Sequence, residues 1–181
     1  MGMALRVPQY TTSDLDLLPD DGNRYELLAG MLLVTPGPGS AHQGVAAMLS
    51  ALFASHVLER RLRLFSPGTV RRPPLTHLEP DVLVMPPGFV PGTPWDEATE
   101  HWLAVEVLSR SSRVYDREFK RDAYLALGVR EVWLVDVENR CIEVCVGPGR
   151  GRLQYDVVEW SAPGGASSVR VELDALFADV R

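Results

Sequence analysis

The sequence predicts an α/β or α+β fold in which helices pack against a mixed β-sheet. Three observations carry this prediction: the order hairpin, helix, strands, helix, strands; a nearly continuous apolar run at residues 101–109; and a length of 181 residues. The run HWLAVEVLS is typical of a strand buried on both faces, since a half-exposed strand would alternate with polar residues. We expect one domain over residues 1–181, because one core suffices at this length.

The N-terminal part is expected to contain a short helix, a hairpin and a long helix. Helical residues are expected around Ser13–Leu18, and Tyr25–Pro36 is predicted to form a hairpin with a glycine at its turn. The loop Gly37–Ser40 follows, and its last residue is a suitable N-cap. Apolar residues at helical spacing then predict a helix from Ala41 to Arg61.

The rest of the chain is expected to contain mostly strands around one further helix. That helix runs from Val114 to Leu127 and ends before Gly128, a good residue after a helix C-terminus. Loops are expected at Arg71–Pro74 and Pro86–Glu100. The expected strands are Leu62–Val70, Glu79–Met85, His101–Ser109, Val132–Val137, Arg140–Val146, Gln154–Trp160 and Val169–Leu173, with a helical turn at Asp174–Val180.

Composition limits the classes of partner and the compartment. A net charge of −6 argues against a broad basic surface that coats nucleic acid, but it leaves room for a local basic patch. No apolar run approaches the roughly 18–20 residues that span a bilayer, and no signal peptide is seen, so we expect a cytoplasmic protein without a membrane segment. Cys141 and Cys145 lie about 13 Å apart along an expected strand, too far for a disulfide, which favours a reducing compartment.

Two carboxylates inside apolar strands are the sharpest chemical signal. Asp81 lies in PDVLV and Glu106 in LAVEVL, although ionised carboxylates are almost never fully buried unless they are paired or bind a metal. Pairing with an arginine or capping of a backbone amide is the structural alternative for each. A hard cation such as Mg²⁺ takes oxygen ligands, so two carboxylates and a main-chain carbonyl would suffice. Such a cation would supply a nucleophilic water for phosphodiester cleavage.

A single lysine stands among the basic residues. Of 18 basic side chains, 17 are arginine and only Lys120 is lysine. A coding bias explains the excess of arginine, but a compact ammonium can do what a planar guanidinium cannot. A lysine near the carboxylates could orient water or stabilise negative charge.

Weaker candidates lie on the two expected helices and on the hairpin. Basic residues at helical spacing form a stripe that could meet phosphates, although a solvated face is the alternative; the stripe contains Arg113, Arg117, Lys120, Arg121 and Tyr124. Glu26 in the hairpin and His42 at a helix start are each more often structural.

The ordered set of these residues resembles a known family. The resemblance rests on Pro80-Asp81, Glu106 in VEVLS, Asp116, Lys120, Tyr124 and Gly128-Val129, the run Glu131–Asp136, and the earlier Tyr25–Gly30 and His42. Together they resemble the Uma-type family of restriction-endonuclease-like proteins, within the PD-(D/E)XK nuclease superfamily. The similarity extends over roughly residues 10 to 175.

This resemblance implies a restriction-endonuclease-like core, with a mixed sheet flanked by helices and an N-terminal hairpin. It implies that Asp81 and Glu106 bind Mg²⁺ or Mn²⁺, with the carbonyl of Val107 as a third ligand. Glu26 and His42 join Lys120 as implied catalytic residues. The superfamily places its lysine two residues after the glutamate, where this chain has Leu108, and Lys120 on the following helix takes its place.

Three functional hypotheses follow. The first is a metal-dependent endonuclease that hydrolyses phosphodiester bonds of DNA. The second is a non-catalytic module that binds nucleic acid or protein on a nuclease fold. The third is a structural dimerisation domain whose carboxylates are merely paired, and a homodimer is compatible with all three.

Overall fold

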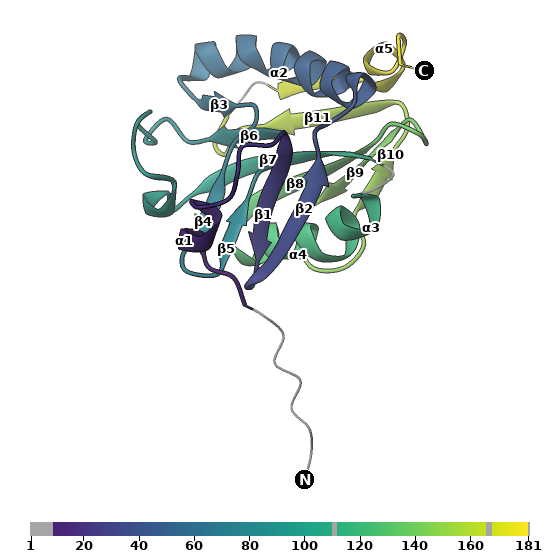
Figure 1. Cartoon of the computed structure of the whole chain (residues 1–181). Helices are drawn as coiled ribbons and strands as arrows, with labels where there is room; N and C mark the ends of the chain where they lie inside the picture. The colour runs from purple at the N-terminus through teal and green to yellow at the C-terminus, as the bar shows by residue number, and fades with distance from the viewer. Residues whose placement is uncertain (1–8, 110–111, 166–167, 181) are drawn as a thin grey trace.

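The structure is a computed structural model that describes residues 9–109, 112–165 and 168–180; the side chains of residues 58–60 also lie outside the description. Figure 1 shows a long helix across the top of a sheet, with a hairpin and two further strands standing across the front of the sheet. The chain passes through strands and helices in the order that the sequence predicts, with several strands divided into shorter ones.

The main sheet has six strands in the order β10-β9-β8-β7-β6-β3. Neighbours are antiparallel except β7 and β8, which pair in parallel and make the sheet mixed. Its strands are β3 (Arg63–Phe65), β6 (Val82–Met85), β7 (His101–Leu108), β8 (Val129–Asp136), β9 (Cys141–Cys145) and β10 (Arg152–Gln154). The predicted apolar strand is β7, and its position between β6 and β8 explains why it is apolar on both faces.

Two smaller sheets accompany the main one. The first has the order β2-β1-β5-β4 and contains the predicted hairpin, and the second pairs β11 with β12. Their strands are β1 (Asn23–Leu28), β2 (Met31–Pro36), β4 (Val70–Arg72), β5 (Thr76–Leu78), β11 (Val157–Ser161) and β12 (Ser168–Glu172). Ala29 and Gly30 both have positive φ at the turn of the hairpin, which is the conformation that a tight two-residue turn requires.

Helices cover both faces of the main sheet. The long helix is α2 (Ser40–Arg60), and the helix after β7 consists of α3 (Arg113–Tyr115), a π-helical turn η2 (Asp116–Lys120) and α4 (Arg121–Ala126). The remaining helical segments are α1 (Thr12–Leu15), η1 (Trp95–Glu97) and α5 (Leu173–Leu176). None of the helices in the described ranges combines the length and the hydropathy needed to span a bilayer.

Two apolar clusters form the core, one on each face of the main sheet. The first joins α2 to inward side chains such as Val82, Val105 and Trp133, and the second joins α4 to side chains such as Leu83 and Ala104. Because successive residues of a strand point to opposite faces, neighbouring residues of β6 and β7 belong to different clusters. This alternation decides which face each buried carboxylate occupies.

Four predictions about elements are wrong in detail. The expected strand Leu62–Val70 is interrupted after β3, and the expected loop Arg71–Pro74 begins as part of β4, which pairs with β5. The expected strand Gln154–Trp160 is likewise divided between β10 and β11. Ser40 is the first residue of α2 rather than the N-cap before it. Short strands at sheet edges carry little periodicity, so the sequence does not resolve them.

Cys141 and Cys145 are free thiols.

Acid sensitivity of the fold is expected from His101, the first residue of β7. Its side chain is 0% exposed, and neither ring nitrogen has a hydrogen-bond partner among the described residues. Burial, reinforced by the charge of Arg72, lowers the pKa of His101 from 6.5 to about 4. The neutral ring therefore stabilises the fold above pH 6.5, and this contribution is lost as the pH falls towards 4.

Urea unfolding at a series of pH values checks this prediction. In wild type, His101 should lower the free energy of unfolding by on the order of 3 kcal/mol between pH 6.5 and pH 4. In His101→Leu this part of the decrease should be absent. The difference between the two proteins isolates this histidine from the other three. Parallel pH profiles for wild type and His101→Leu would contradict the assignment.

Candidate active site

Strand register brings the two buried carboxylates to the same face of the main sheet. Val82 pairs with Val105 in the antiparallel β6–β7 ladder, so Asp81, directly before β6, is opposite Glu106. Both residues are spaced by two from members of the second core cluster, Leu83 and Ala104, and therefore share the face that α4 covers. The two carboxylates therefore lie side by side on one face of the sheet.

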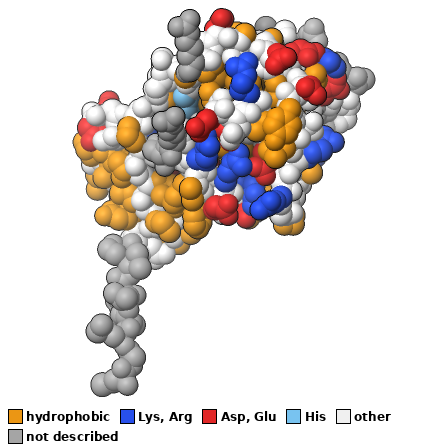
Figure 2. All heavy atoms as spheres, turned by 90° about the vertical axis from the view of Figure 1, so that its right-hand side faces the viewer, with side chains coloured by type: hydrophobic (Ala, Val, Ile, Leu, Met, Phe, Trp, Pro, Cys, Tyr) orange, Lys and Arg blue, Asp and Glu red, His pale blue; other side chains and the backbone are white. Residues whose placement is uncertain are grey.

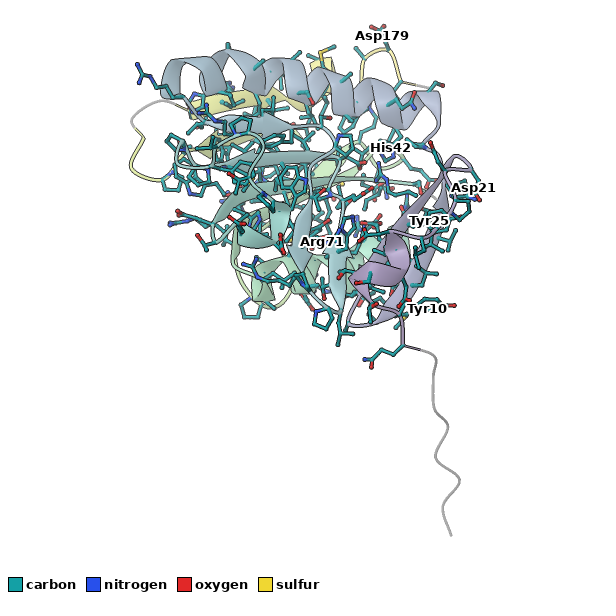
Figure 3. The ribbon with its side chains drawn as sticks, turned by 60° about the vertical axis from the view of Figure 1, so that its left-hand side comes forward. Tyr10, Asp21, Tyr25, His42, Arg71 and Asp179 are labelled. Atoms are coloured by element: carbon teal, nitrogen blue, oxygen red, sulfur yellow. The ribbon has the colours of Figure 1, made fainter. Side chains whose placement is uncertain are left out.

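Asp81 is held by three groups from different parts of the chain. Its Oδ1 accepts a hydrogen bond from Arg24 Nη1 at 3.0 Å, and its Oδ2 accepts one from the Val107 amide at 2.8 Å. The Nε2 atom of His42 lies 3.0 Å from the same Oδ2. Figure 3 shows His42 beneath the start of α2. Asp81 thus links the hairpin, α2 and β7.

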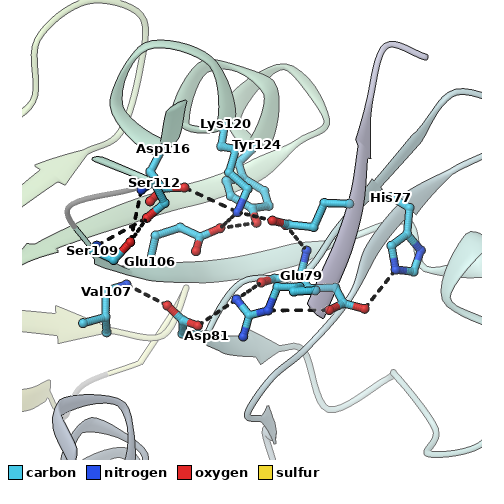
Figure 4. A network of polar contacts seen from close by, with 12 residues as sticks. His77, Glu79, Asp81, Glu106, Val107, Ser109, Ser112, Asp116, Lys120 and Tyr124 are labelled. Carbon is cyan, nitrogen blue, oxygen red and sulfur yellow. Dashed lines mark hydrogen bonds and ion pairs between the residues drawn. The ribbon is translucent and has the colours of Figure 1, made fainter. Parts of the chain in front are cut away.

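Glu106 lies at the centre of a second group of contacts (Figure 4). Its Oε1 accepts hydrogen bonds from Lys120 Nζ at 2.9 Å and from the Tyr124 hydroxyl at 2.6 Å. The ammonium of Lys120 also lies 2.8 Å from Glu26 Oε2 and 3.5 Å from Asp116 Oδ1. One buried lysine therefore contacts three carboxylates, among them Glu106.

The π-helical turn explains how the helix supplies this group. Asp116, Lys120 and Tyr124 are spaced by four residues, and in a regular α-helix this spacing drifts around the axis. The wider turn of η2 reduces that drift, so all three side chains are buried against the sheet. π-Helical turns occur often at functional sites, and no sequence pattern that we used predicts this one.

The hairpin closes the site from the side of β1. Glu26 is buried, its Oε1 accepts a hydrogen bond from the Glu79 amide at 2.7 Å, and its other oxygen contacts Lys120. The sequence analysis missed Arg24, which shares a face with Glu26 because the two are separated by two positions on β1. The spacing of two along an expected strand is the signal from which Arg24 could have been predicted to lie beside Glu26.

A cleft of about 350 Å³ opens over these groups. Its described lining comes from the hairpin, the residues after β2, the start of α2, the end of β7 and the first part of the helix that follows. Four carboxylates line it, against two permanent cations, Arg24 and Lys120, and His42; the carboxylates are Glu26, Asp81, Glu106 and Asp116. With all four carboxylates ionised and His42 neutral, the formal negative charge of the cleft exceeds its positive charge by two.

Burial and the neighbouring charges together shift the pKa values of the groups in the cleft. Burial raises the pKa of Glu106 well above its usual range, and the neighbouring carboxylates raise it further, against the effect of Lys120. Burial also raises the pKa of Asp116. Burial acts in the same direction on Asp81, but contacts with His42 and the charge of Arg24 outweigh it and hold the pKa of Asp81 below its usual value. Burial lowers the pKa of Lys120, but its three carboxylate neighbours raise it above the usual value of lysine.

The expected basic stripe divides into two faces in the structure. Lys120 and Tyr124 turn inward to Glu106, whereas the three arginines turn towards acidic residues of the β8–β9 region. The arginine contacts are Arg113 with Asp136 and Glu138, Arg117 with Asp136 and Glu143, and Arg121 with Asp122 and Glu143. Their positive charge is therefore largely balanced within the chain.

Comparison with known proteins gives the family to which the chain belongs. Residues 12–179 match the profile of Uma2, a family described as "Putative restriction endonuclease". The match extends over most of the chain, so the chain belongs to the Uma2 family.

One solved structure is similar along nearly the whole chain. It is a crystal structure described as a "putative nuclease belonging to DUF820" from Anabaena variabilis ATCC 29413, with a TM-score of 0.78 and 18% sequence identity, covering 93% of this chain and 97% of the other. At this identity the likeness establishes the fold alone, and the mixed α+β architecture agrees with the restriction-endonuclease-like core expected of the family. Among curated proteins, none matches the chain.

Proposed function

We propose that this protein is a metal-dependent endonuclease that hydrolyses phosphodiester bonds of DNA. The observation that carries the proposal is the convergence of four carboxylates on two permanent cations in one cleft. Buried charges that only stabilise a fold are normally paired one to one, and here four carboxylates share two permanent cations. A divalent cation would balance this excess. Membership of the Uma2 family supports the same reading.

The residues available favour Mg²⁺ or Mn²⁺. In the described ranges, no group of three histidine, cysteine or carboxylate side chains is arranged to hold a metal ion, so a site made by side chains alone is not supported. Mg²⁺ needs only one or two carboxylates and keeps several waters. Asp81, Glu106 and the carbonyl of Val107 would hold it, sharing the carboxylates with Arg24 and Lys120. When bound, the cation supplies Lewis-acid stabilisation and activates water for attack on phosphorus.

The other side chains of the cleft position and balance charge. Lys120 keeps its proton because three carboxylates surround it, so its role is to orient water or to stabilise negative charge on the phosphate. Tyr124 fixes the orientation of Glu106 through their hydrogen bond. Arg24 and His42 orient Asp81, and His42 also faces the cleft, where its ring can contact a phosphate oxygen.

A second candidate function is a binding module without catalysis. It is favoured by the complete set of ion pairs around Lys120 and by Leu108, a buried apolar residue where the superfamily has its lysine. Such a module would bind nucleic acid or protein in the same cleft. The cytoplasm is the proposed compartment for either function, since Cys141 and Cys145 are unpaired thiols.

Nicking of supercoiled plasmid DNA separates the two functions. Wild-type protein with Mg²⁺ or Mn²⁺ should convert supercoiled plasmid to the open circular form, and EDTA should stop the conversion. Metal binding measured by calorimetry, without nicking of any form of DNA, would support the binding module instead.

Two carboxylates of the cleft should differ in their effect on metal binding. Asp81 is proposed as a metal ligand, whereas Glu26 is held by Lys120 and by the Glu79 amide. Asp81→Asn should therefore weaken Mn²⁺ binding, measured by isothermal titration calorimetry, by at least about tenfold more than Glu26→Gln does. An equal or larger loss in Glu26→Gln would place Glu26 among the ligands.

A further inference from the structure

An aromatic pair, of which one ring is exposed, lies beside the cleft. Tyr115 lines the cleft, and its ring centroid is 5.0 Å from that of Phe119, with the ring planes 32° apart. The Tyr115 hydroxyl donates a hydrogen bond to the sulfur of Met31 at 3.2 Å, which ties this ring to β2. Phe119 is 48% exposed although it is a large apolar side chain.

Further exposed apolar side chains surround this pair. We call the set Met31, Val114, Tyr115 and Phe119 the apolar rim; three of its members are 48–69% exposed, and the fourth, Tyr115, is partly buried. Figure 2 looks onto the face that carries α3 and shows hydrophobic side chains beside blue and red ones. Exposed apolar residues gathered at the border of a cleft indicate a binding surface.

The charges near the apolar rim do not favour the surface of a DNA duplex. Arg113, Arg117 and Arg121 contact acidic residues of this chain, and the permanent cations among the described cleft residues, Arg24 and Lys120, contact carboxylates. Free cations that neutralise phosphates supply most of the affinity for a duplex and a smaller share for a single strand, whose bases are also open to stacking. Aromatic side chains instead bind the faces of unpaired bases, which a duplex keeps stacked within the helix.

We propose that the apolar rim stacks unpaired nucleobases of a DNA strand whose phosphate lies in the cleft. The substrate class is therefore DNA with an unpaired segment at the cleavage site, which a negatively supercoiled plasmid also offers, rather than a relaxed, fully paired duplex. Phe119 supplies the exposed stacking face, and Tyr115 carries the surface from Phe119 to the cleft. This inference rests on the proposed nuclease function, and its test uses binding without cleavage.

Fluorescence anisotropy with labelled DNA measures binding, with Ca²⁺ in place of Mg²⁺ so that a cation still balances the charge of the cleft, and a gel of the same samples checks that the probes stay uncut. The probes are an oligothymidylate and a blunt duplex of the same length. Wild type should bind the oligothymidylate at least about tenfold more tightly than the duplex, and Phe119→Ala should weaken oligothymidylate binding by about tenfold, the effect expected for the loss of one stacked base. Phe119→Trp should keep the affinity, because it keeps an aromatic face.

Tyr155→Ala is the matched control. Tyr155 is an aromatic side chain with 59% exposure that is not among the described residues lining the cleft, so its replacement should change neither affinity. Equal binding of both probes by wild type, or unchanged binding by Phe119→Ala, would overturn the inference. Sedimentation velocity tests whether a second copy of this chain occupies the apolar rim instead. If wild type is a dimer that Phe119→Ala dissociates, and DNA binding is unchanged, the apolar rim is a self-association surface and the inference is overturned.

The plasmid assay distinguishes failure of this inference from failure of the proposed function. If wild type nicks plasmid while Phe119→Ala binds and cuts single-stranded DNA like wild type, only the inference fails. If wild type neither binds nor cuts any DNA, both fail.

Discussion

Replacing Lys120 by methionine is expected to lower the free energy of unfolding at pH 7 by about 3–5 kcal/mol. Methionine fits the volume of the lysine stem but removes the ammonium that Glu26, Glu106 and Asp116 share. Three buried carboxylates then lack their common cation, and breaking a buried ion pair by removal of one partner is strongly destabilising. Urea unfolding at pH 7 measures the loss.

The pH dependence of this loss gives a second readout. Carboxylates without a cation take up protons as the pH falls, so the difference between wild type and Lys120→Met should shrink between pH 7 and pH 5. A loss below about 1 kcal/mol at pH 7, the range typical of exposed pairs, would show that the network contributes little to stability.

Lys120→Arg separates the structural role from the catalytic one. It keeps the positive charge and much of the helix propensity, so the protein should fold and bind metal at Asp81 and Glu106. Its planar guanidinium places charge and donors differently, and most plasmid nicking should be lost. Equal nicking by wild type and Lys120→Arg would show that a compact ammonium is not required.

Glu106→Gln should abolish cleavage without destabilising the fold. The glutamine is nearly isosteric and can still accept the hydrogen bond from Tyr124, while Lys120 retains Glu26 and Asp116. The change also removes one of the surplus negative charges in the cleft. We expect an unchanged or slightly higher free energy of unfolding and a fall in nicking of at least about a hundredfold, comparable to the loss of one preorganised group at other active sites.

The matched control for this variant is Glu131→Gln on β8. Glu131 is a partly buried carboxylate outside the described lining of the cleft, and it accepts a hydrogen bond from Trp133 at 2.6 Å. Its replacement should leave nicking unchanged. A Glu106→Gln protein that is strongly destabilised, or that still nicks plasmid at the wild-type rate, would return Glu106 to a purely structural role.

Much of the fold could be predicted because the long elements carry strong local signals. The glycine turn of the hairpin, the helical spacing in α2 and the apolar run of β7 each identify an element without reference to the rest of the chain. The short strands β4 and β5 could not be found this way, because three-residue strands are defined by their partners and not by periodicity.

Part of the candidate site could also be predicted from local signals in the sequence. Asp81 and Glu106 stand out because charge interrupts apolar strands, and alternation along the strands then puts them on one face. The inward turn of Lys120 depends on the π-helical turn η2, for which no local pattern was available. The partners of the arginines, such as Asp136 and Glu143, could not be predicted, because they lie on β8 and β9 and meet the helix only in the folded chain.

The most direct test of the account is a crystal of the wild-type protein soaked in Mn²⁺ and measured for anomalous scattering. If the proposed metal site is correct, we expect an anomalous peak coordinated by the carboxylates of Asp81 and Glu106 and by the carbonyl of Val107. We also expect the peak to be absent from crystals of Glu106→Gln. A well-ordered cleft with no peak at saturating Mn²⁺, or a peak coordinated by other residues, would contradict the proposed metal site and with it the assignment of this cleft as a nuclease centre.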